Sequence, residues 1–296
     1  MKILVTGGTG FTGRRVLSLL EGRGQIRCLV RSGSMVTNIE KLKHEVAYGD
    51  LSDQESLAKA MIGCEALINI ASMGFGHIPG IVRCAENAGI KRVIFISTTA
   101  IFTHLNTNSK SIRQEAEDCV MRSSLEWTIL RPTMIYGTPE DRNMIRLIRF
   151  IDHLPLIPVF GSGNYLQQPV HVEDVAKSIV AVLFNRNTIK KEFNISGKFS
   201  KTYNEIVDIT ANALGKKITK IHMPYKLSIY LSMLYEKFST KPFLKREQIM
   251  RLNENKEFDH TAARKIFGFN PISFEEGIAK EVTLYRQYNS KNTTHK

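Results

Sequence analysis

The sequence of 296 residues contains only four cysteines, and none of them has a partner at a spacing typical of a chemical site. It has no Cys-x-x-Cys pair and no Cys and His spacing of a zinc site, so we expect no bound metal. Scattered single cysteines are typical of small buried residues in a reducing compartment. They are Cys28, Cys64, Cys84 and Cys119.

The sequence also has no long hydrophobic run. No segment approaches the roughly 20 apolar residues needed to cross a bilayer. The first residues, MKILVTGG, enter a strand-like pattern at once and form no apolar signal segment with a cleavage site. These absences argue against export and membrane insertion, and we expect a cytoplasmic protein.

Acidic residues are the minority, with 28 Asp and Glu against 41 Lys and Arg, a net charge of +13. Such an excess suits nucleic acid, an anionic membrane surface or a phosphate-bearing substrate, or it is simply a solvated basic surface. No motif combines aromatic and basic residues, so we expect no nucleic-acid partner. Ten of the cations against three Glu lie between Lys216 and Lys256. We expect an anionic small-molecule substrate, and the sequence indicates no oligomeric state.

Apolar runs typical of strands alternate with helical patterns along the first half of the chain. This succession predicts an α/β fold, a Rossmann doubly wound parallel sheet with a smaller mixed C-terminal substrate lobe. We expect a dinucleotide-binding domain over 1–140, the lobe over 141–288 and a polar tail over 289–296, and a return of the chain to the sheet is left open. The expected strands are 1–6, 26–30, 42–48, 66–70, 92–97 and 125–130, and the helices between them are 12–21, 80–89 and 111–123.

The segment TGGTGFTG, residues 6–13, joins the first expected strand to the first helix. Gly7 permits a tight turn, Gly10 lets the backbone approach a pyrophosphate, and Gly13 lets the helix pack closely on the strand. The helix N-terminus then offers free N–H groups and a positive dipole end to the anion. This context predicts a dinucleotide site.

Two residues after later strands refine the cofactor prediction. Arg31 follows the second strand, where an NAD-specific site would carry an acid for the ribose hydroxyls. A cation suits a 2′-phosphate, so we expect NADP(H), with NAD(H) and a plain surface arginine as the alternatives. Asp50, after the third strand, either accepts a hydrogen bond from the adenine amino group or caps a helix beginning near Ser52.

Further motifs accompany this loop: GDL at 49–51, STTA at 97–100, LRPTMIYG at 130–137, QPVHVEDVA at 168–176 and FGFNP at 267–271. With them the chain resembles the extended and atypical short-chain dehydrogenase/reductases, the NAD-dependent epimerase/dehydratase superfamily. The resemblance spans nearly the whole chain and implies a nicotinamide cofactor. The residues it implies as cofactor ligands are Gly7, Thr9, Gly10, Phe11, Thr12, Gly13, Arg31, Asp50, Leu51, Ala71, Ser72, Arg113 and Pro132.

The same resemblance implies a Ser or Thr, a Tyr and a Lys for catalysis, the last two spaced Tyr-x-x-x-Lys on one helix face. There the Tyr is the acid/base and the Lys lowers its pKa. Thr99 matches the Ser/Thr position. Matching Glu117 to the acid after the family's Lys puts Arg113 at the Lys position and Ser109 at the Tyr position. The dyad is missing, and a serine hydroxyl is too weak an acid to replace it unaided.

Three nearby residues are candidate substitutes, each with an ordinary structural alternative. Lys110 either replaces the missing lysine or is a solvated side chain. Tyr136 either acts as a relocated acid or packs with one hydrogen bond. His171 either faces the substrate or supports the helix that follows it. We take Thr99 and Tyr136 as the candidate catalytic residues.

Two functions follow from these observations. The first is an NADP(H)-dependent oxidoreductase, or a sugar-nucleotide epimerase/dehydratase-like enzyme, with a remodelled active site. The second is a non-catalytic NADP(H)-binding regulatory or scaffold protein, as in members of the atypical branch that lack the dyad. We favour an enzyme, because the polar residues 140–143 after the LRPTMIYG motif form an edge that a scaffold would not need.

The helical pattern KLSIYLSMLYEKF, residues 226–238, combines many apolar residues with flanking lysines. An apolar face beside cations suits a helix on a membrane surface. The apolar residues cover more than one stripe, however, and thirteen residues give a small insertion area. We therefore expect a helix buried between the two lobes as one wall of the substrate cleft, and a membrane surface is the less favoured partner.

Overall fold

The computed structural model describes residues 1–105, 107–238 and 245–293, and the chain divides into two compact units. The chain enters the first unit three times, so it returns to the sheet, a possibility that the sequence left open. Unit 1 consists of Met1–Thr133, Val172–Ile195 and Asp259–Asn270, and unit 2 of Met134–His171, Ser196–Phe258 and Pro271–Lys296.

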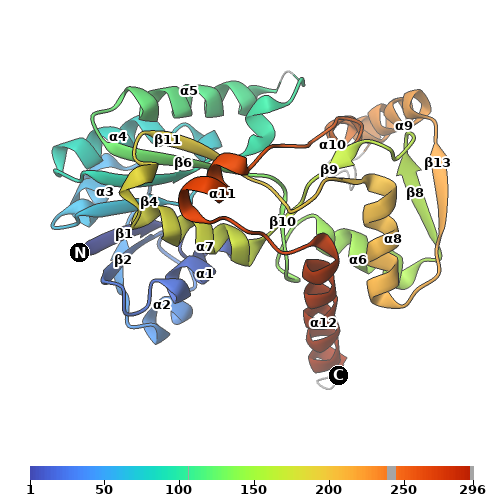
Figure 1. Cartoon of the computed structure of the whole chain (residues 1–296), viewed down its shortest axis with the longest axis horizontal. Helices are drawn as coiled ribbons and strands as arrows, with labels where there is room; N and C mark the ends of the chain where they lie inside the picture. Colours follow the sequence, from blue (N-terminus) through green and yellow to red (C-terminus); the bar gives the residue numbers. More distant parts are fainter. Residues whose placement is uncertain (106, 239–244, 294–296) are drawn as a thin grey trace. The chain divides into compact units, whose positions relative to one another are not determined.

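Unit 1 is built on a seven-stranded parallel sheet with the order β11-β6-β5-β4-β1-β2-β3, which confirms the predicted fold class (Figure 1). The order reverses between β1 and β4, and ligands of such sheets bind outside the carboxyl ends of the strands at this point. The strands are β1 Lys2–Thr6, β2 Gln25–Val30, β3 Glu45–Tyr48, β4 Ala66–Asn69, β5 Arg92–Ile96, β6 Glu126–Pro132 and β11 Lys191–Ile195.

The central strands are apolar because helices cover the sheet on both faces. All residues of β4 and β5 are buried, as expected for parallel strands between two helical layers. Helices α3, α4 and α5 pack together over one face, and α1 packs with α7 over the other (Figure 1). The helices of this unit are α1 Phe11–Leu19, α2 Thr37–Lys41, α3 Gln54–Met61, α4 Ile78–Asn87, α5 Asn108–Arg122, α7 Val172–Leu183 and α11 Thr261–Phe267, with 3-10 turns η1 Met73–Phe75, η2 Thr99–Phe102 and η3 Arg186–Thr188.

The returning segments complete the sheet and satisfy a buried cation. Arg92 is 9% exposed, and its guanidinium donates to the carbonyl oxygens of Glu126 and Val182 at 2.7 and 2.5 Å and to Thr188 Oγ1 at 2.8 Å. Burial lowers the pKa of Arg92 to about 10. Two of these three acceptors belong to the segment that leads into β11, and the third belongs to β6. Arg92 therefore links β6 to the segment before β11.

Unit 2 has its own hydrophobic core, formed by α6, α8 and α12. Strands β8 and β13 pair in parallel, and Thr202 and Glu205 form a capping box that starts α8. The elements are β7 Ile135–Tyr136, α6 Met144–His153, β8 Leu156–Phe160, β9 Leu166–Gln167, β10 Val170–His171, β12 Lys201–Thr202, α8 Tyr203–Leu214, β13 Thr219–Met223, α9 Tyr225–Phe238, α10 Arg246–Leu252 and α12 Phe274–Thr293. Helix α12 runs to Thr293 and so includes the first residues of the expected polar tail.

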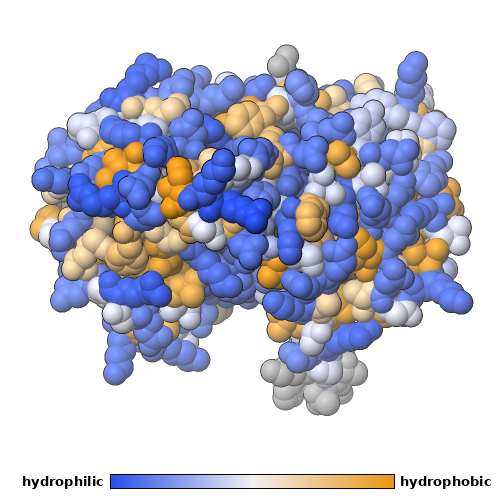
Figure 2. Space-filling view, in the orientation of Figure 1, coloured by the Kyte–Doolittle hydropathy of each residue, from blue (hydrophilic) through white to orange (hydrophobic). Residues whose placement is uncertain are grey.

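The surface is mixed, as the ordinary composition suggests. On the face drawn in Figure 2, hydrophobic residues lie in small patches among a hydrophilic majority. Within the described ranges, no helix is both long enough and apolar enough to cross a membrane.

Candidate dinucleotide and substrate site

A tight glycine loop joins β1 to α1 at the carboxyl edge of the sheet. Gly7 has a φ of +73°, and a Cβ there would lie 2.8 Å from the backbone nitrogen of Ala71. A Cβ on Gly13 would overlap the carbonyl oxygen of Gly7 and lie 2.7 Å from the Cα of Gly8. The Gly10 N–H closes the loop by donating to Gly7 O at 3.0 Å. Glycine at these positions lets α1 lie directly on the strand.

The first turn of α1 is open to an anion. Its N-cap residue, Gly10, is exposed and has no side chain to occupy the first N–H groups of the helix. These N–H groups and the positive end of the helix dipole favour a phosphate. Thr9 and Phe11 are half-buried at the rim, and Thr12 is buried beneath them. The loop therefore has the shape and polarity of a diphosphate cradle.

A buried pair of hydrogen bonds ties β1 to β4 below this loop. Thr6 Oγ1 donates to Asn69 Oδ1 at 2.7 Å, and Asn69 Nδ2 donates to the carbonyl oxygen of Ala71 at 3.0 Å. The pair fixes Ala71, and with it Ser72, beside the glycine loop. Asn69 is a positioning residue that sequence reasoning missed, because a single asparagine at a strand end belongs to no spacing pattern.

Arg31 and Asp50 follow β2 and β3 at the same edge of the sheet. Asp50 Oδ1 accepts hydrogen bonds from the N–H and the hydroxyl of Ser52, at 2.9 and 2.6 Å. These bonds hold the pKa of Asp50 below its ordinary value, with smaller effects from the charges of His77 and Arg31. The carboxylate therefore stays ionised at neutral pH.

Asp50 does not cap α3, which corrects one of the two roles weighed for it. The cap is Asp53, whose carboxylate accepts from the Glu55 N–H at 3.1 Å. Leu51, between them, packs against the hydrophobic core of unit 1. Arg31 is exposed, and its charge contributes to the lowered pKa of Asp50. It is therefore available to an anionic ligand.

Helix α5 carries the residues that the resemblance puts at the positions of the dyad. Ser109 and Arg113 lie one turn apart on α5, and Arg113 Nη1 donates to the Ser109 carbonyl oxygen at 3.2 Å. The Arg113 guanidinium packs against Gly74, where a Cβ would lie 3.1 Å from its Nε. Lys110 Nζ donates to the Thr103 carbonyl oxygen at 2.7 Å, so it tethers the preceding loop.

Two hydroxyl groups lie where β5 ends. Thr99 Oγ1 donates to the Pro132 carbonyl oxygen at 3.4 Å and so links the ends of β5 and β6. Ser97 is 8% exposed, and its Oγ has no hydrogen-bond partner among the described residues. A buried hydroxyl of this kind is satisfied by a polar ligand or water. With the glycine cradle, it is a second feature that fits a dinucleotide, and sequence reasoning did not identify it.

Tyr136 is enclosed in the core of unit 2. It is 1% exposed, and its ring lies edge-on to His171 at 5.5 Å and tilted against Phe274 at 5.3 Å between ring centroids. Its hydroxyl occupies the space that a Cβ on Gly277 would need. Tyr136 and His171 are thus packed together, and α12 covers the phenol.

A buried pair of carboxyl groups lies next to this tyrosine. Glu281 is fully buried and accepts from the Gly137 N–H at 3.0 Å, while Asp141 accepts from the N–H groups of Asn143 and Ile145 at the start of α6. Burial and the neighbouring Asp141 raise the pKa of Glu281 to about 10. Glu281 therefore carries a proton at neutral pH and donates it in a hydrogen bond to Asp141.

A hollow of about 550 Å³ lies in unit 2 where β8 and β13 end. Asn253 forms one wall, and its Nδ2 donates to the Phe160 carbonyl oxygen at 2.8 Å. His222 Nε2 lies 3.1 Å from Asn204 Oδ1. Polar groups beside aromatic faces suit a polar small molecule. The lining residues are Gly161, Ser162, Tyr165, His222, Met223, Pro224, Tyr225 and Asn253.

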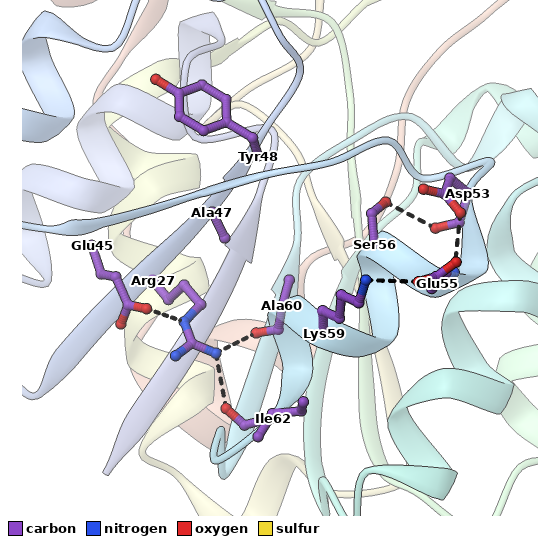
Figure 3. A pocket seen from close by; sticks show the side chains of 10 residues that line it. All are labelled: Arg27, Glu45, Ala47, Tyr48, Asp53, Glu55, Ser56, Lys59, Ala60 and Ile62. Carbon is purple, nitrogen blue, oxygen red and sulfur yellow. Dashed lines mark hydrogen bonds and ion pairs between the residues drawn. The ribbon is translucent and has the colours of Figure 1, made fainter.

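A second hollow, of about 660 Å³, lies along the edge strand β3 and helix α3 of unit 1 (Figure 3). Its charged side chains are already paired. Arg27 Nε donates to Glu45 Oε1 at 2.7 Å, and Lys59 Nζ contacts Glu55 at 2.7 Å. The two ion pairs neutralise four of the charged side chains, and the fifth, Asp53, accepts from the Glu55 N–H at the start of α3, so we assign the groove a structural role.

Metal-ligating side chains do not gather in the described ranges. There, no group of three or more His, Cys, Asp or Glu side chains is placed to hold a metal ion.

Comparison with known proteins gives matches over most of the chain. The family model described as NAD(P)H-binding matches residues 7–186. A ceramide reductase of Caulobacter vibrioides is 29% identical over 236 residues, which are 75% of this chain and 73% of that protein. The N-acetyl-alpha-D-glucosaminyl-diphospho-ditrans,octacis-undecaprenol 4-epimerase of Escherichia coli O157:H7 is 21% identical, over 93% of this chain and 92% of that protein.

A solved structure shares the fold over almost the full length. The UDP-glucose 4-epimerase of Thermotoga maritima with UDP-glucose superposes with a TM-score of 0.76 at 18% identity, and covers 97% of this chain and 99% of its own.

Proposed function

Because the chain belongs to the NAD(P)H-binding family, we propose that it is an NADP(H)-dependent oxidoreductase or an epimerase- or dehydratase-like enzyme with a remodelled active site. The choice of NADP(H) rests on Arg31, whose exposed guanidinium follows β2. In this fold the residue at that place faces the ribose 2′ position, and a cation there favours a 2′-phosphate over a hydroxyl.

The other cofactor contacts in this proposal follow the carboxyl edge of the sheet. The N–H groups of the glycine loop at Gly10 and the start of α1 would bind the diphosphate, and Asp50 would accept from the adenine amino group. Arg113, beside Gly74, would offer a fixed positive charge on the nicotinamide side. The bound nicotinamide would supply a hydride acceptor or donor.

In this proposal proton transfer does not use the family's phenol, because matching Glu117 to the family's acid puts Ser109 at the tyrosine position. Of the two hydroxyl groups expected to act on substrate, Thr99 lies at the carboxyl edge of the sheet, whereas Tyr136 is enclosed below Gly277. We therefore assign Thr99 to the proposed site and give Tyr136 a packing role. Arg113 could orient an anion but not tune a proton donor, since it remains charged.

The proposed substrate is an anionic, lipid-linked small molecule. Two relatives are named for lipid-type substrates, a ceramide and a diphospho-undecaprenol sugar, and the second of these carries a diphosphate. The cationic residues between Lys216 and Lys256 would attract such a charge. The alternative is a non-catalytic NADP(H)-binding protein. The one argument for it is the expected absence of the Tyr-x-x-x-Lys dyad.

The test of the cofactor assignment is the substitution Arg31→Asp. We expect the native chain to bind NADPH more tightly than NADH, and the variant to lose about tenfold to a hundredfold in NADPH affinity, as for a charge-assisted bond. Fluorescence titration of both cofactors measures this. The matched control is Arg23→Asp, which replaces an exposed arginine before β2, at the opposite edge of the sheet.

A native preference for NADH, or an equal loss in both variants, would contradict the NADP(H) assignment. Gly10→Val should abolish binding of either cofactor, because its side chain would lie in the approach path of the diphosphate. With a lipid-linked diphosphate substrate, steady oxidation of NADPH would show an oxidoreductase, and conversion of the substrate without net oxidation of the cofactor would show an epimerase- or dehydratase-like enzyme. A non-catalytic binding protein would give neither.

A further inference from the structure

Helix α9 has the opposite burial pattern to an ordinary surface helix, which buries its apolar side chains and exposes its polar ones. Its buried residues are two serines, Ser228 and Ser232, while most of its apolar side chains are exposed. This corrects the expectation that the helix is buried. The exposed side chains are Tyr225, Leu227, Tyr230, Leu231, Met233, Tyr235 and Phe238, with exposed fractions of 40–88%.

Four apolar residues of α9 form a single stripe. Leu227, Leu231, Leu234 and Phe238 follow one another at intervals of four, three and four residues, so at 100° per residue they fall within about 60° of the helix circumference. The two serines lie on another side of the helix. Leu227 and Leu231 are 47% and 44% exposed, and Leu234 is half-buried.

Cations border this stripe. Lys226 and Lys237 are exposed on α9, and Tyr230 lies between them and the leucines on the helix surface. Lys245 and Arg246 are exposed at the start of α10, which packs against α9 and is joined to it where the Arg246 N–H donates to Glu236 at 2.6 Å. A row of leucines beside tyrosines and lysines matches the layers of a bilayer interface, which are apolar, then aromatic, then anionic.

We propose that α9 docks on the surface of an anionic lipid bilayer, with its axis parallel to the membrane and the leucine stripe inserted. At 1.5 Å per residue its 14 residues span about 21 Å, too short to cross the hydrocarbon core. A second copy of the chain is a poorer occupant, because pairing the stripe with itself would bring Lys226 and Lys237 of both copies together. The proposal does not depend on the cofactor assignment.

Vesicle flotation of the full chain tests the proposal. We expect the protein to float with vesicles of phosphatidylglycerol and phosphatidylcholine at low salt, to bind pure phosphatidylcholine weakly, and to be released as salt screens the lysines. Leu231→Glu should lower the partition coefficient by about tenfold to a hundredfold, the effect of losing one inserted leucine. The matched control is Leu284→Glu on α12, which replaces a leucine that is 40% exposed.

A second variant, Lys226→Gln with Lys237→Gln, changes only exposed side chains and keeps the test valid if Leu231→Glu unfolds. It should lower binding to anionic vesicles by about fivefold per charge and weaken the salt dependence. No flotation at low salt, or an equal loss in Leu231→Glu and Leu284→Glu, would overturn the proposal. So would a native dimer without lipid binding that Leu231→Glu converts to a monomer in analytical ultracentrifugation.

Discussion

At the scale of the residue, several glycines of this chain are needed because a side chain at their positions would clash with neighbouring atoms. Gly7 and Gly13 are required because backbone atoms occupy the positions of their missing side chains. At Gly74 the neighbouring group is a side chain, because the Arg113 guanidinium occupies the space that a side chain at position 74 would need. The loop between β1 and α1 and the packing of α5 thus both depend on glycines.

Gly13→Ala should destabilise the protein and abolish NADPH binding. Its Cβ would overlap the Gly7 carbonyl oxygen, so α1 must move away from the strand, at a cost of roughly 1–3 kcal/mol. Urea unfolding and NADPH titration measure the two effects. The matched control is Gly80→Ala in α4, where a Cβ would meet only the Gln54 side chain, at 3.6 Å or more.

For Gly80→Ala we expect a gain of about 0.5–1 kcal/mol from helix propensity, with unchanged NADPH binding. If Gly13→Ala were as stable as the control and still bound NADPH, the close approach of α1 to the strand would not shape the cradle.

At the scale of the element, the protonated carboxyl group of Glu281 on α12 lies beside Asp141, which caps the start of α6. The pKa of Glu281 is about 10 in the folded chain, but in the unfolded chain the carboxyl group releases its proton near 4.5, the ordinary pKa of a glutamate. Between these values the folded state binds one more proton than the unfolded state, so this group makes stability fall as pH rises. One such proton contributes at most about 1.4 kcal/mol per pH unit.

Glu281→Gln should therefore stabilise the chain at pH 8, and the gain should shrink as pH falls toward 5. The amide can still donate to Asp141 and accept from the Gly137 N–H, and it needs no proton. Thermal unfolding of both proteins across this range measures the gain. The matched control on the same helix is Glu275→Gln.

Glu275 pairs with Lys201 at 2.8 Å, and its hydrogen bond with that lysine lowers the pKa of Glu275, so its removal should not stabilise the chain at pH 8. A gain from Glu281→Gln that is equal at pH 5 and pH 8 would mean that the two carboxyl groups share no proton in the native state.

At the scale of the whole molecule, unit 1 is discontinuous in sequence, and its edge depends on segments from far along the chain. A fragment ending at residue 140 should fail to fold. It lacks β11 and α7, so the sheet face that α7 covers is exposed to water, and the Arg92 guanidinium loses its bonds to Val182 and Thr188. Circular dichroism and NADPH titration of the fragment test this.

The control joins 1–133, 172–195 and 259–270 by short flexible linkers. It restores β11 and α11, whose Phe267 packs edge-on against Phe193 at 5.2 Å. We expect this protein to fold and bind NADPH. Cooperative unfolding of the 1–140 fragment would show that the returning segments are dispensable.

The sequence allowed the sheet and the glycine loop to be predicted, because apolar runs and backbone constraints are local properties. The unit boundaries were not predictable, since the pairing of β6 with β11 joins residues about 60 positions apart. Asn69, Ser97 and Glu281 were missed for a related reason. Their roles come from burial, and burial depends on which distant segment covers each side chain. The exposure of α9 likewise depends on its neighbours.

The three-part composition of unit 1 also affects how the protein is made. A ribosome completes Thr133, then adds about 125 residues before Asp259 begins the last piece of this unit. The 57 residues from 134 to 190 come before Lys191 begins β11, so at roughly 5–20 residues per second the growing chain waits about 3–11 s with the edge of β6 unpaired. During this interval the nascent chain exposes a strand edge suited to chaperones or to aggregation. Expression at lower temperature, or slower translation of the early segment, would change how long the strand edge stays unpaired. Neither change would alter the finished molecule.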